Sequence, residues 1–308
     1  MKILVFGAGV LGCSLARDLF RGGKDVTLLA RGAWGQEIQK NGLRIKSALF
    51  PHTTVSRIPV TGALTPEDDY DAVFVAVRCT QIQGALDTLR ACKARYILFL
   101  GNNVRAPEVA AQLPGKTVLF AFASSAGHRE KNRVVSADMR KITVGPLRGA
   151  ASAEALIEEL FRGTGYRVCY EPNMGDYLLS HAAFVLPAVF ACYRTDGDLK
   201  KLRHNDAYLN KLIDATVEGY RAILRAGHEV RPKEDRAFET PAFRKTCFRF
   251  YKLLCWTVLG KICVSDHAMN AVDEMRALNR DMNAFLDRAG GQYPTWQALE
   301  KECGKYLK

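Results

Sequence analysis

The sequence predicts an α/β domain with a doubly wound parallel sheet, followed by an all-α domain. Two observations predict this arrangement. Short apolar runs of the strand type alternate with helical patterns up to residue 171, and after that residue only helical patterns continue. A chain of 308 residues is about the right length for two domains. We therefore expect one domain over residues 1–171 and a second over residues 172–308.

The composition is that of an ordinary globular protein, with 48% hydrophobic and 25% charged residues. The formal net charge of +12 raises nucleic-acid binding as an alternative. The basic residues are spread along the chain, however, and the densest groups (129–133, 200–203 and 244–252) form no long basic arm. A positive field also suits a phosphorylated cofactor and an acidic substrate. We expect these small-molecule partners and no nucleic acid.

The N-terminus and the cysteines bear on location. The N-terminus lacks the apolar core and cleavage site of a signal peptide. No apolar run reaches the roughly 18–20 residues that span a bilayer. The nine cysteines include no C-x-x-C pair. We therefore expect a cytoplasmic protein with reduced, mostly buried thiols, no membrane partner and no metal site.

The first element is a short buried strand, Ile3–Phe6, which runs directly into three glycines. A helix is predicted from Leu11 to Arg21, and a second strand over Asp25–Ala30. This succession within about 30 residues is the context that the dinucleotide fingerprint of a Rossmann-type domain requires. The first glycine allows the tight turn, the second lets the backbone approach the pyrophosphate, and the third lets helix and strand pack closely. We expect the cofactor to bind Gly7, Ala8, Gly9, Val10, Leu11 and Gly12.

The residue after the second strand discriminates between two cofactors. An NAD site usually has Asp or Glu there, which binds the ribose 2′-hydroxyl. In this chain the strand ends in LLARG, with Arg31 in that place. A guanidinium attracts the 2′-phosphate that a carboxylate would repel. We predict NADP(H), and the alternative for Arg31 is a surface arginine in a loop.

Three further strand patterns are each followed by a polar residue. Ligands of a doubly wound sheet bind outside the carboxyl ends of its strands. Arg78, Asn102 and Ser124 are therefore expected at the cofactor crevice. The alternatives are a helix cap for Asn102 and a solvated charge for Arg78. The strands are predicted over 71–77, 95–100 and 117–122, a hairpin-rich stretch over 126–148, a helix over 151–161 and a last strand over 166–170.

The second half of the chain is predicted to be entirely helical. His181 lies in the apolar stretch HAAFVLP, either as a core residue or as an active-site residue. Glu274 follows His267 by seven residues, which would place both on one face of a helix. The alternative for Glu274 is an exposed surface position. The helices are predicted over 173–191 (with a kink at its proline), 206–226, 233–238, 240–259, 267–289 and 295–306.

Several local motifs together resemble those of the ketopantoate reductase (2-dehydropantoate 2-reductase) family. They are MKILVFGAGVLG with VTLLAR, then VAVRCTQ with its Gln81, FLGNNV with its Asn102, and VGPL at 144–147. The resemblance covers nearly the whole chain. It implies a fold of the 6-phosphogluconate dehydrogenase-like group, NADPH as the hydride donor and the ketone of ketopantoate as the acceptor. It also implies a homodimer contact on the helical domain.

The sequence departs from the family's pattern at its catalytic positions. Arg78 stands in place of the family's lysine. When the helical motif is aligned on Pro187, Leu178 occupies the place of the catalytic lysine, and Ala182 and Leu186 occupy those of two asparagines. A ketone reductase needs an acid for the carbonyl oxygen and donors for its developing negative charge. Leucine supplies neither.

His181, one helical turn after Leu178, is the best candidate for this acid. Glu274 is the candidate that would orient it, because Glu274 and Asn279 match the family's late motif. Asn102, as a further catalytic residue, would hold the nicotinamide side or a substrate carboxylate together with Arg78. These residues predict an NADPH-dependent reductase of a small 2-oxo acid. The alternative is a catalytically inactive NADP-binding protein that senses the cofactor ratio or binds a partner.

Overall fold

The computed structural model describes residues 1–149 and 152–307. Its contacts divide the chain into two compact units. The α/β unit comprises residues 1–101 and 105–174, and the helical unit comprises residues 102–104 and 175–308. The helix predicted from residue 151 is observed from Ser152, and residue 151 itself lies outside the described part of the chain.

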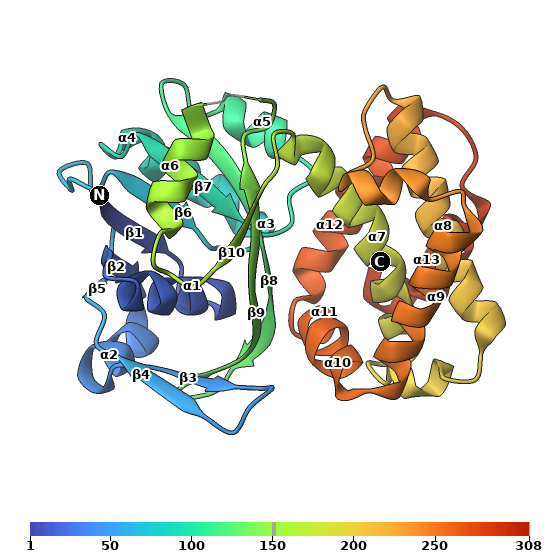
Figure 1. Cartoon of the computed structure of the whole chain (residues 1–308), viewed down its shortest axis with the longest axis horizontal. Helices are drawn as coiled ribbons and strands as arrows, with labels where there is room; N and C mark the ends of the chain where they lie inside the picture. The colour runs from blue at the N-terminus through green and yellow to red at the C-terminus, as the bar shows by residue number, and fades with distance from the viewer. Residues whose placement is uncertain (150–151, 308) are drawn as a thin grey trace. The chain divides into compact units, whose positions relative to one another are not determined.

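Six parallel strands form the centre of the sheet in the α/β unit (Figure 1). Across the sheet they lie in the order β5-β2-β1-β6-β7-β8. When these six strands are numbered one to six along the chain, their order across the sheet is 3-2-1-4-5-6. This is the order of a doubly wound dinucleotide-binding sheet. The predicted Rossmann-type fold is therefore confirmed. The strands are β1 Lys2–Phe6, β2 Asp25–Leu29, β5 Val60–Thr61, β6 Ala72–Val75, β7 Tyr96–Leu100 and β8 Thr117–Arg129.

The sheet is wider than predicted, because β8 does not end at residue 122. It continues to Arg129 and turns back as β9 (Val134–Gly145), with an irregularity in the pairing between Ala123 and Ser125. β9 then pairs with two more strands, of which β3 continues the sheet to β4. The hairpin prediction for 126–148 is wrong, because the two strand patterns in that stretch, RVVSAD and KITVGPL, lie in the single strand β9, whose hairpin partner is β8. The added strands are β3 Leu43–Ser47, β4 Thr53–Ser56 and β10 Arg167–Tyr170.

The sequence analysis missed several short elements of this unit. β3 and β4 mix polar and apolar residues, as in LRIKS and TTVS, and α2 contains two glycines, so none has a strong periodic signal. β5 has only two residues. The helices of the unit are α1 Val10–Arg21, α2 Gly32–Asn41, α3 Cys79–Ile82, α4 Leu86–Ala91, α5 Ala106–Ala111 and α6 Ser152–Phe161.

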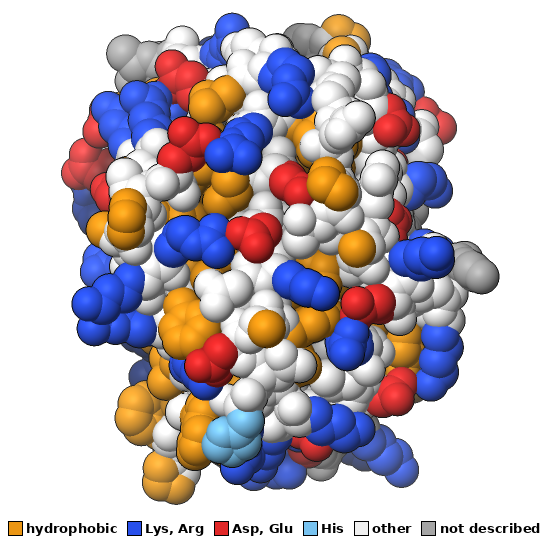
Figure 2. All heavy atoms as spheres, turned by 90° about the vertical axis from the view of Figure 1, so that its right-hand side faces the viewer, with side chains coloured by type: hydrophobic (Ala, Val, Ile, Leu, Met, Phe, Trp, Pro, Cys, Tyr) orange, Lys and Arg blue, Asp and Glu red, His pale blue; other side chains and the backbone are white. Residues whose placement is uncertain are grey.

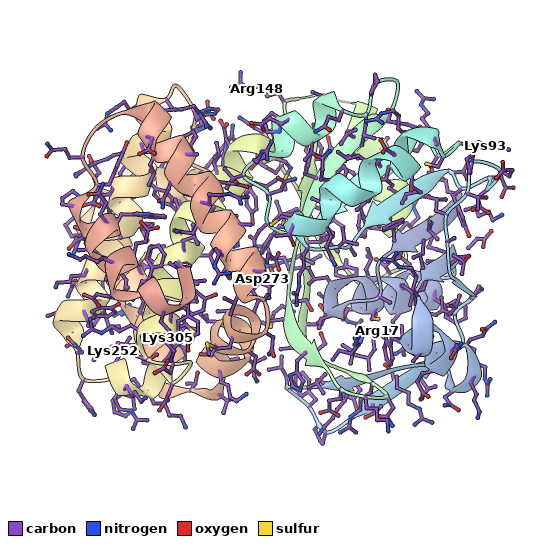
Figure 3. The ribbon with its side chains drawn as sticks, turned by 180° about the vertical axis from the view of Figure 1, so that it is seen from behind. Arg17, Lys93, Arg148, Lys252, Asp273 and Lys305 are labelled. Atoms are coloured by element: carbon purple, nitrogen blue, oxygen red, sulfur yellow. The ribbon has the colours of Figure 1, made fainter. Side chains whose placement is uncertain are left out.

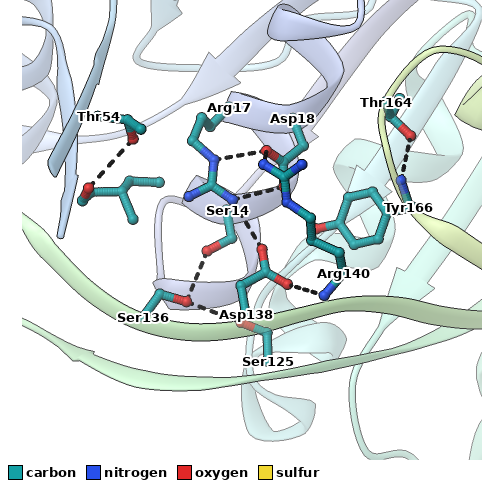
Figure 4. Close-up of polar contacts among 11 residues, drawn as sticks. Ser14, Arg17, Asp18, Thr54, Ser125, Ser136, Asp138, Arg140, Thr164 and Tyr166 are labelled. Atoms are coloured by element: carbon teal, nitrogen blue, oxygen red, sulfur yellow. Dashed lines mark hydrogen bonds and ion pairs between the residues drawn. The ribbon is translucent and has the colours of Figure 1, made fainter. Parts of the chain in front are cut away.

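A buried polar network joins α1 to β9 (Figure 4). Arg17, only 7% exposed, donates two hydrogen bonds of 2.8 Å to Asp18 and one of 3.0 Å to Asp138. One turn earlier, Ser14 donates to Ser136 at 3.2 Å. Buried charges are tolerated only when they are paired. The network therefore holds the distal part of the β8–β9 hairpin against α1.

The helical unit has its own hydrophobic core around α7. Phe190 of α7 contacts Trp296 edge-to-face at 5.4 Å between ring centroids, and both side chains are fully buried. The α7 helix is long and apolar enough to cross a membrane, with a mean hydropathy of 1.4, but 72% of that window is buried within the protein. It therefore has the character of a core helix. The helices are α7 Met174–Arg194, α8 Asp206–Arg225, α9 Pro241–Trp256, α10 Val258–Gly260, α11 Asp266–Asn270, α12 Val272–Ala289, α13 Pro294–Glu302 and α14 Gly304–Leu307.

Three predicted helices are broken in the structure. The helix predicted over 295–306 is interrupted at Cys303, between α13 and α14. The helix predicted over 240–259 ends at Trp256, because Thr257 is extended (φ −123°, ψ 167°) and its side chain caps the next turn. The helix predicted over 267–289 is interrupted at Ala271 (φ −132°, ψ 40°). By contrast, α7 runs as one helix through Pro187.

Basic side chains are distributed over both units. Figure 2 shows Lys and Arg side chains interspersed with Asp and Glu on one face of the molecule. Among the residues labelled in Figure 3, Lys252 donates to Asp206 and Lys305 donates to Asp196, the latter at 2.9 Å. These two lysines are thus paired with neighbouring carboxylates.

Candidate functional site

The glycine loop after β1 has the geometry of a phosphate cradle. Gly7 has a positive φ of +119°, and a Cβ there would lie 2.7 Å from the carbonyl oxygen of Ala76. A Cβ on Gly12 would lie 1.9 Å from the carbonyl oxygen of Gly7. A Cβ on Gly9 would meet no atom within 4 Å. Two glycines are therefore required by packing, whereas Gly9 leaves an open approach to the backbone at the start of α1.

The loop lies at the point where the strand order reverses. β2 and β5 are on one side of β1, and β6, β7 and β8 are on the other. In such sheets the ligand binds in the crevice outside the carboxyl ends of the strands. Arg31 follows β2 and Arg78 follows β6, and both side chains are exposed. The structure thus places these two predicted residues and the glycine loop at the same edge of the sheet.

The residues at this edge fit a phosphorylated dinucleotide. Arg31 is the N-cap residue of α2, and the first turns of α1 and α2 contain no acidic residue. Free backbone N–H groups and a partial positive charge at helix N-termini favour phosphates. Arg78 is the N-cap residue of α3, and its backbone N–H donates to the side-chain oxygen of Gln81 at 3.2 Å. Gln81 therefore supports the backbone of this turn.

Trp34 is a residue of this site that the sequence analysis missed. Its indole Nε1–H donates to the carbonyl oxygen of Ala8 at 3.0 Å, so the first turn of α2 is tied to the glycine loop. The guanidinium of Arg129 lies over the Trp34 ring, 5.5 Å from its centroid. The only sequence signal was an aromatic residue three positions after Arg31.

Asn102 was expected beside the cofactor-binding residues, but it belongs to the helical unit together with residues 103 and 104. Val104 packs against the core of that unit. The alternative role as a helix cap is wrong, since α5 begins at Ala106 with Arg105 as its N-cap residue. The side-chain oxygen Oδ1 of Asn102 is buried without a hydrogen-bond partner. Such an oxygen is costly unless a ligand or water satisfies it.

His181 is half-buried on α7. Its ring is parallel to that of Tyr177, one turn earlier, with 6.4 Å between centroids and 7° between planes. Burial, and then the nearby His267, lower the pKa of His181 to about 4. The imidazole is therefore neutral at pH 7 in the free protein. A general acid works best when its pKa is near the working pH, so an acidic role requires a ligand that raises the pKa.

Glu274 is buried, with 7% of its surface exposed, so the alternative of an exposed position is wrong. The prediction that His267 and Glu274 share one helix face is also wrong, because α11 ends before Ala271 and α12 begins after it. The Nδ2 of Asn279 donates to Glu300, while its Oδ1 is buried without a hydrogen-bond partner. The helical unit thus contains His181, Glu274 and Asn102, while the predicted nucleotide-binding residues other than Asn102 are in the α/β unit.

The three positions aligned with the family's polar catalytic residues are all buried and apolar. Leu178 is 2% exposed, Ala182 1% and Leu186 0%. Ala182 and Leu186 belong to the helical core. Apolar packing thus fills these three positions, and His181 and Tyr177 are half-buried polar residues on the same part of α7.

Comparisons with known proteins support the same assignment. Residues 3–149 match the family model described as ketopantoate reductase PanE/ApbA. The 2-dehydropantoate 2-reductase of Archaeoglobus fulgidus is 25% identical over 232 residues, which cover 74% of this chain and 76% of that protein. The enzyme of the same name from Pyrococcus abyssi is 22% identical over 249 residues, which cover 78% of this chain and 80% of that protein.

Two solved structures show the same fold over nearly the full length. The 2-dehydropantoate 2-reductase from Geobacter metallireducens GS-15 has a TM-score of 0.80 at 19% identity and covers 99% of both chains. D-mandelate dehydrogenase with NADH and anilino(oxo)acetate has a TM-score of 0.79 at 14% identity, over 100% of this chain and 98% of that one. The family match in the α/β unit and the relatives that extend through the helical unit lead to one conclusion: residues 3–149 match the ketopantoate reductase family, and the chain as a whole is similar to 2-dehydropantoate 2-reductases.

Proposed function

We propose that the protein is an NADPH-dependent reductase of a small 2-oxo acid. The observation that carries this proposal is the open glycine loop at the carboxyl end of β1, with Arg31 at the end of the neighbouring β2. When bound, the cofactor supplies a hydride. A structural neighbour binds NADH, but an arginine in place of the usual acidic residue favours the 2′-phosphorylated form in this chain.

His181 is the proposed proton donor to the carbonyl oxygen, and in the reverse direction its neutral ring accepts the proton of the alcohol. A bound carboxylate near the ring favours the imidazolium and so opposes the burial that lowers its pKa. Glu274 is proposed to orient His181. The unpartnered Oδ1 of Asn102 can accept a hydrogen bond from the bound ligand, and Arg78 can hold a carboxylate.

The substrate is proposed to differ from ketopantoate. The buried, apolar Leu178 removes the cation with which the family mechanism stabilises the developing oxyanion. A mechanism based on an imidazole has a different proton donor in a different position. We retain the substrate class, a carbonyl next to a carboxylate. The arginines at the carboxyl ends of the strands suit an anionic substrate.

The experiment is to measure NADPH and NADH oxidation with a panel of 2-oxo acids that includes ketopantoate. We expect turnover with NADPH, and we expect His181→Gln to lower kcat by at least about 100-fold, the usual contribution of a general acid. The dissociation constant of NADPH should stay within about twofold. The control is His204→Gln, because His204 is exposed and lies against Trp256.

Equal turnover by wild type and His181→Gln would remove His181 from the mechanism. Equal use of NADH and NADPH would contradict the cofactor assignment. Turnover of ketopantoate above all other acids would contradict the proposed change of substrate. The three outcomes are independent of one another.

A further inference from the structure

We propose that Arg129, at the end of β8, is a second cationic ligand of the ribose 2′-phosphate and acts together with Arg31. This inference rests on the proposed use of NADPH and identifies a further residue that determines cofactor specificity. It arises from the long β8–β9 hairpin, whose first strand extends beyond the predicted residue 122 to Arg129. This extension brings a guanidinium over the ring of Trp34, which is hydrogen-bonded to the glycine loop.

Trp34 connects the hairpin to the nucleotide-binding edge. The residue belongs to the first turn of α2, whose N-cap residue is Arg31. Its indole donates to Ala8 inside the glycine loop at 3.0 Å, so the ring is anchored next to the phosphate cradle. Arg129 lies over this same ring at 5.5 Å. Arg129 is also among the groups that act electrostatically on Cys13 of α1.

The charge of Arg129 is not neutralised within the described part of the chain. Its side chain is exposed, and among the described residues it forms no ion pair with a carboxylate. The adjacent Glu130 is held by Arg133 at 2.5 Å. Arg133 also lowers the pKa of Glu130, so that carboxylate remains ionised and paired with a different arginine.

The position of Arg129 over the indole suits a phosphate ligand. A guanidinium over an indole ring is held by a cation–π contact, and its N–H groups can still donate to an anion. Part of the side-chain entropy is therefore lost before the ligand binds. The hairpin is itself fixed to α1 by the Arg17 network, so the position of Arg129 does not depend on a free loop. Two guanidinium groups match a phosphate dianion better than one.

The test is a binding measurement that does not depend on turnover. Dissociation constants are measured by titration calorimetry for adenosine 2′,5′-bisphosphate and for AMP, which differ only in the 2′-phosphate, and for NADPH and NADH. We expect Arg129→Ala to weaken adenosine 2′,5′-bisphosphate and NADPH by about tenfold, the scale of one charge-assisted hydrogen bond. AMP and NADH should change by less than about twofold. Arg129→Glu should weaken the two phosphorylated ligands further.

The matched control is Arg95→Ala. Arg95 is also exposed and also lies over an aromatic ring, that of Tyr96 at 5.4 Å, but it precedes β7 and so lies at the amino end of a parallel strand. This variant should not alter the affinity for any of the four ligands. Arg31→Ala serves as the reference for a lost 2′-phosphate contact.

Three results would overturn the proposal in distinguishable ways. If Arg31→Ala removes the preference for NADPH but Arg129→Ala leaves it intact, only the role of Arg129 is wrong. If wild type binds adenosine 2′,5′-bisphosphate no better than AMP, both the assignment of NADPH and the role of Arg129 are wrong. Equal weakening of AMP and of the bisphosphate by Arg129→Ala would show a structural effect and would also overturn the proposal.

Discussion

At the scale of single residues, the surroundings of His181 decide its charge. The ring stacks on Tyr177 and lies near His267, and its burial in α7 disfavours the imidazolium. In the free protein, these surroundings keep the imidazole of His181 neutral. A bound anion near the ring would favour the imidazolium, so the protonation of His181 depends on the ligand. In the proposed mechanism, this sensitivity allows His181 to supply the proton in place of a lysine.

The lowered pKa of His181 predicts a specific loss of stability in acid. Its pKa is about 4 in the folded protein and 6.5 in the reference state, so the unfolded chain binds more protons between these pH values. Stability is therefore retained above about pH 6.5 and falls as the pH drops towards 4. At about 1.4 kcal/mol per pKa unit, the loss from this group reaches roughly 2 kcal/mol at about pH 5.

Urea unfolding of wild type and His181→Gln at pH 7 and pH 5 measures this loss. We expect the difference between the two pH values to be smaller by roughly 2 kcal/mol in the variant. The exposed His52 provides the control, since His52→Gln should retain the wild-type difference. An unchanged pH dependence in His181→Gln would show that the ring is protonated in the folded protein at pH 5.

At the scale of elements, α1 is held by charges as well as by apolar packing. The side chains of Asp18 and Asp138 are 1% and 7% exposed, and Arg17 bridges them. Arg140 adds a contact to Asp18 at 3.4 Å, and its backbone N–H donates to Asp138 at 2.9 Å (Figure 4). Since α1 begins at the glycine loop, this network stabilises the helix that forms the phosphate cradle.

Removal of Arg17 should therefore destabilise the α/β unit far more than an ordinary change on α1. We expect Arg17→Ala to lower the free energy of unfolding by about 3–5 kcal/mol, because it leaves two buried carboxylates without their shared cation. Arg21→Ala, at the exposed end of the same helix, should cost less than about 0.5 kcal/mol. Urea unfolding gives both values. A loss for Arg17→Ala no larger than that for Arg21→Ala would mean that water already solvates the two carboxylates.

At the scale of the whole molecule, the sequence predicted what local patterns determine. The glycines at 7, 9 and 12 and the succession of strands predicted the doubly wound sheet, and the helical periodicities predicted the second unit. The breaks at Thr257 and Ala271 have no proline or glycine to announce them, so periodicity ran through both. The contacts of Trp34 with Ala8 and Arg129 join segments far apart in the chain, and no local rule predicts them.

The distribution of cysteines over the two cores gives a test of the whole fold. All nine thiols are free, and six of them are buried, with members in both units. Burial raises the pKa of Cys13 in the α/β unit to about 12 and that of Cys192 in the helical unit to about 11. Because only the thiolate reacts, such groups are inert at neutral pH while the cores are intact. Cys263 is the exposed thiol, and Cys79 and Cys169 are half-buried.

We therefore expect a disulfide reagent that reports each thiol by colour to react fastest with one thiol of the native protein at about pH 8. This thiol is Cys263, which the reagent can reach because it is exposed, even though partial burial raises its pKa. Two more should react slowly, and all nine should react at once in concentrated guanidinium chloride. Cys263→Ser should abolish the rapid phase and leave the slow one. Rapid reaction of further thiols in that variant would show that at least one of the two cores opens in the native protein. Repeating the reaction with Cys13→Ser and Cys192→Ser would then identify which unit opens, because each variant removes one buried thiol from one core.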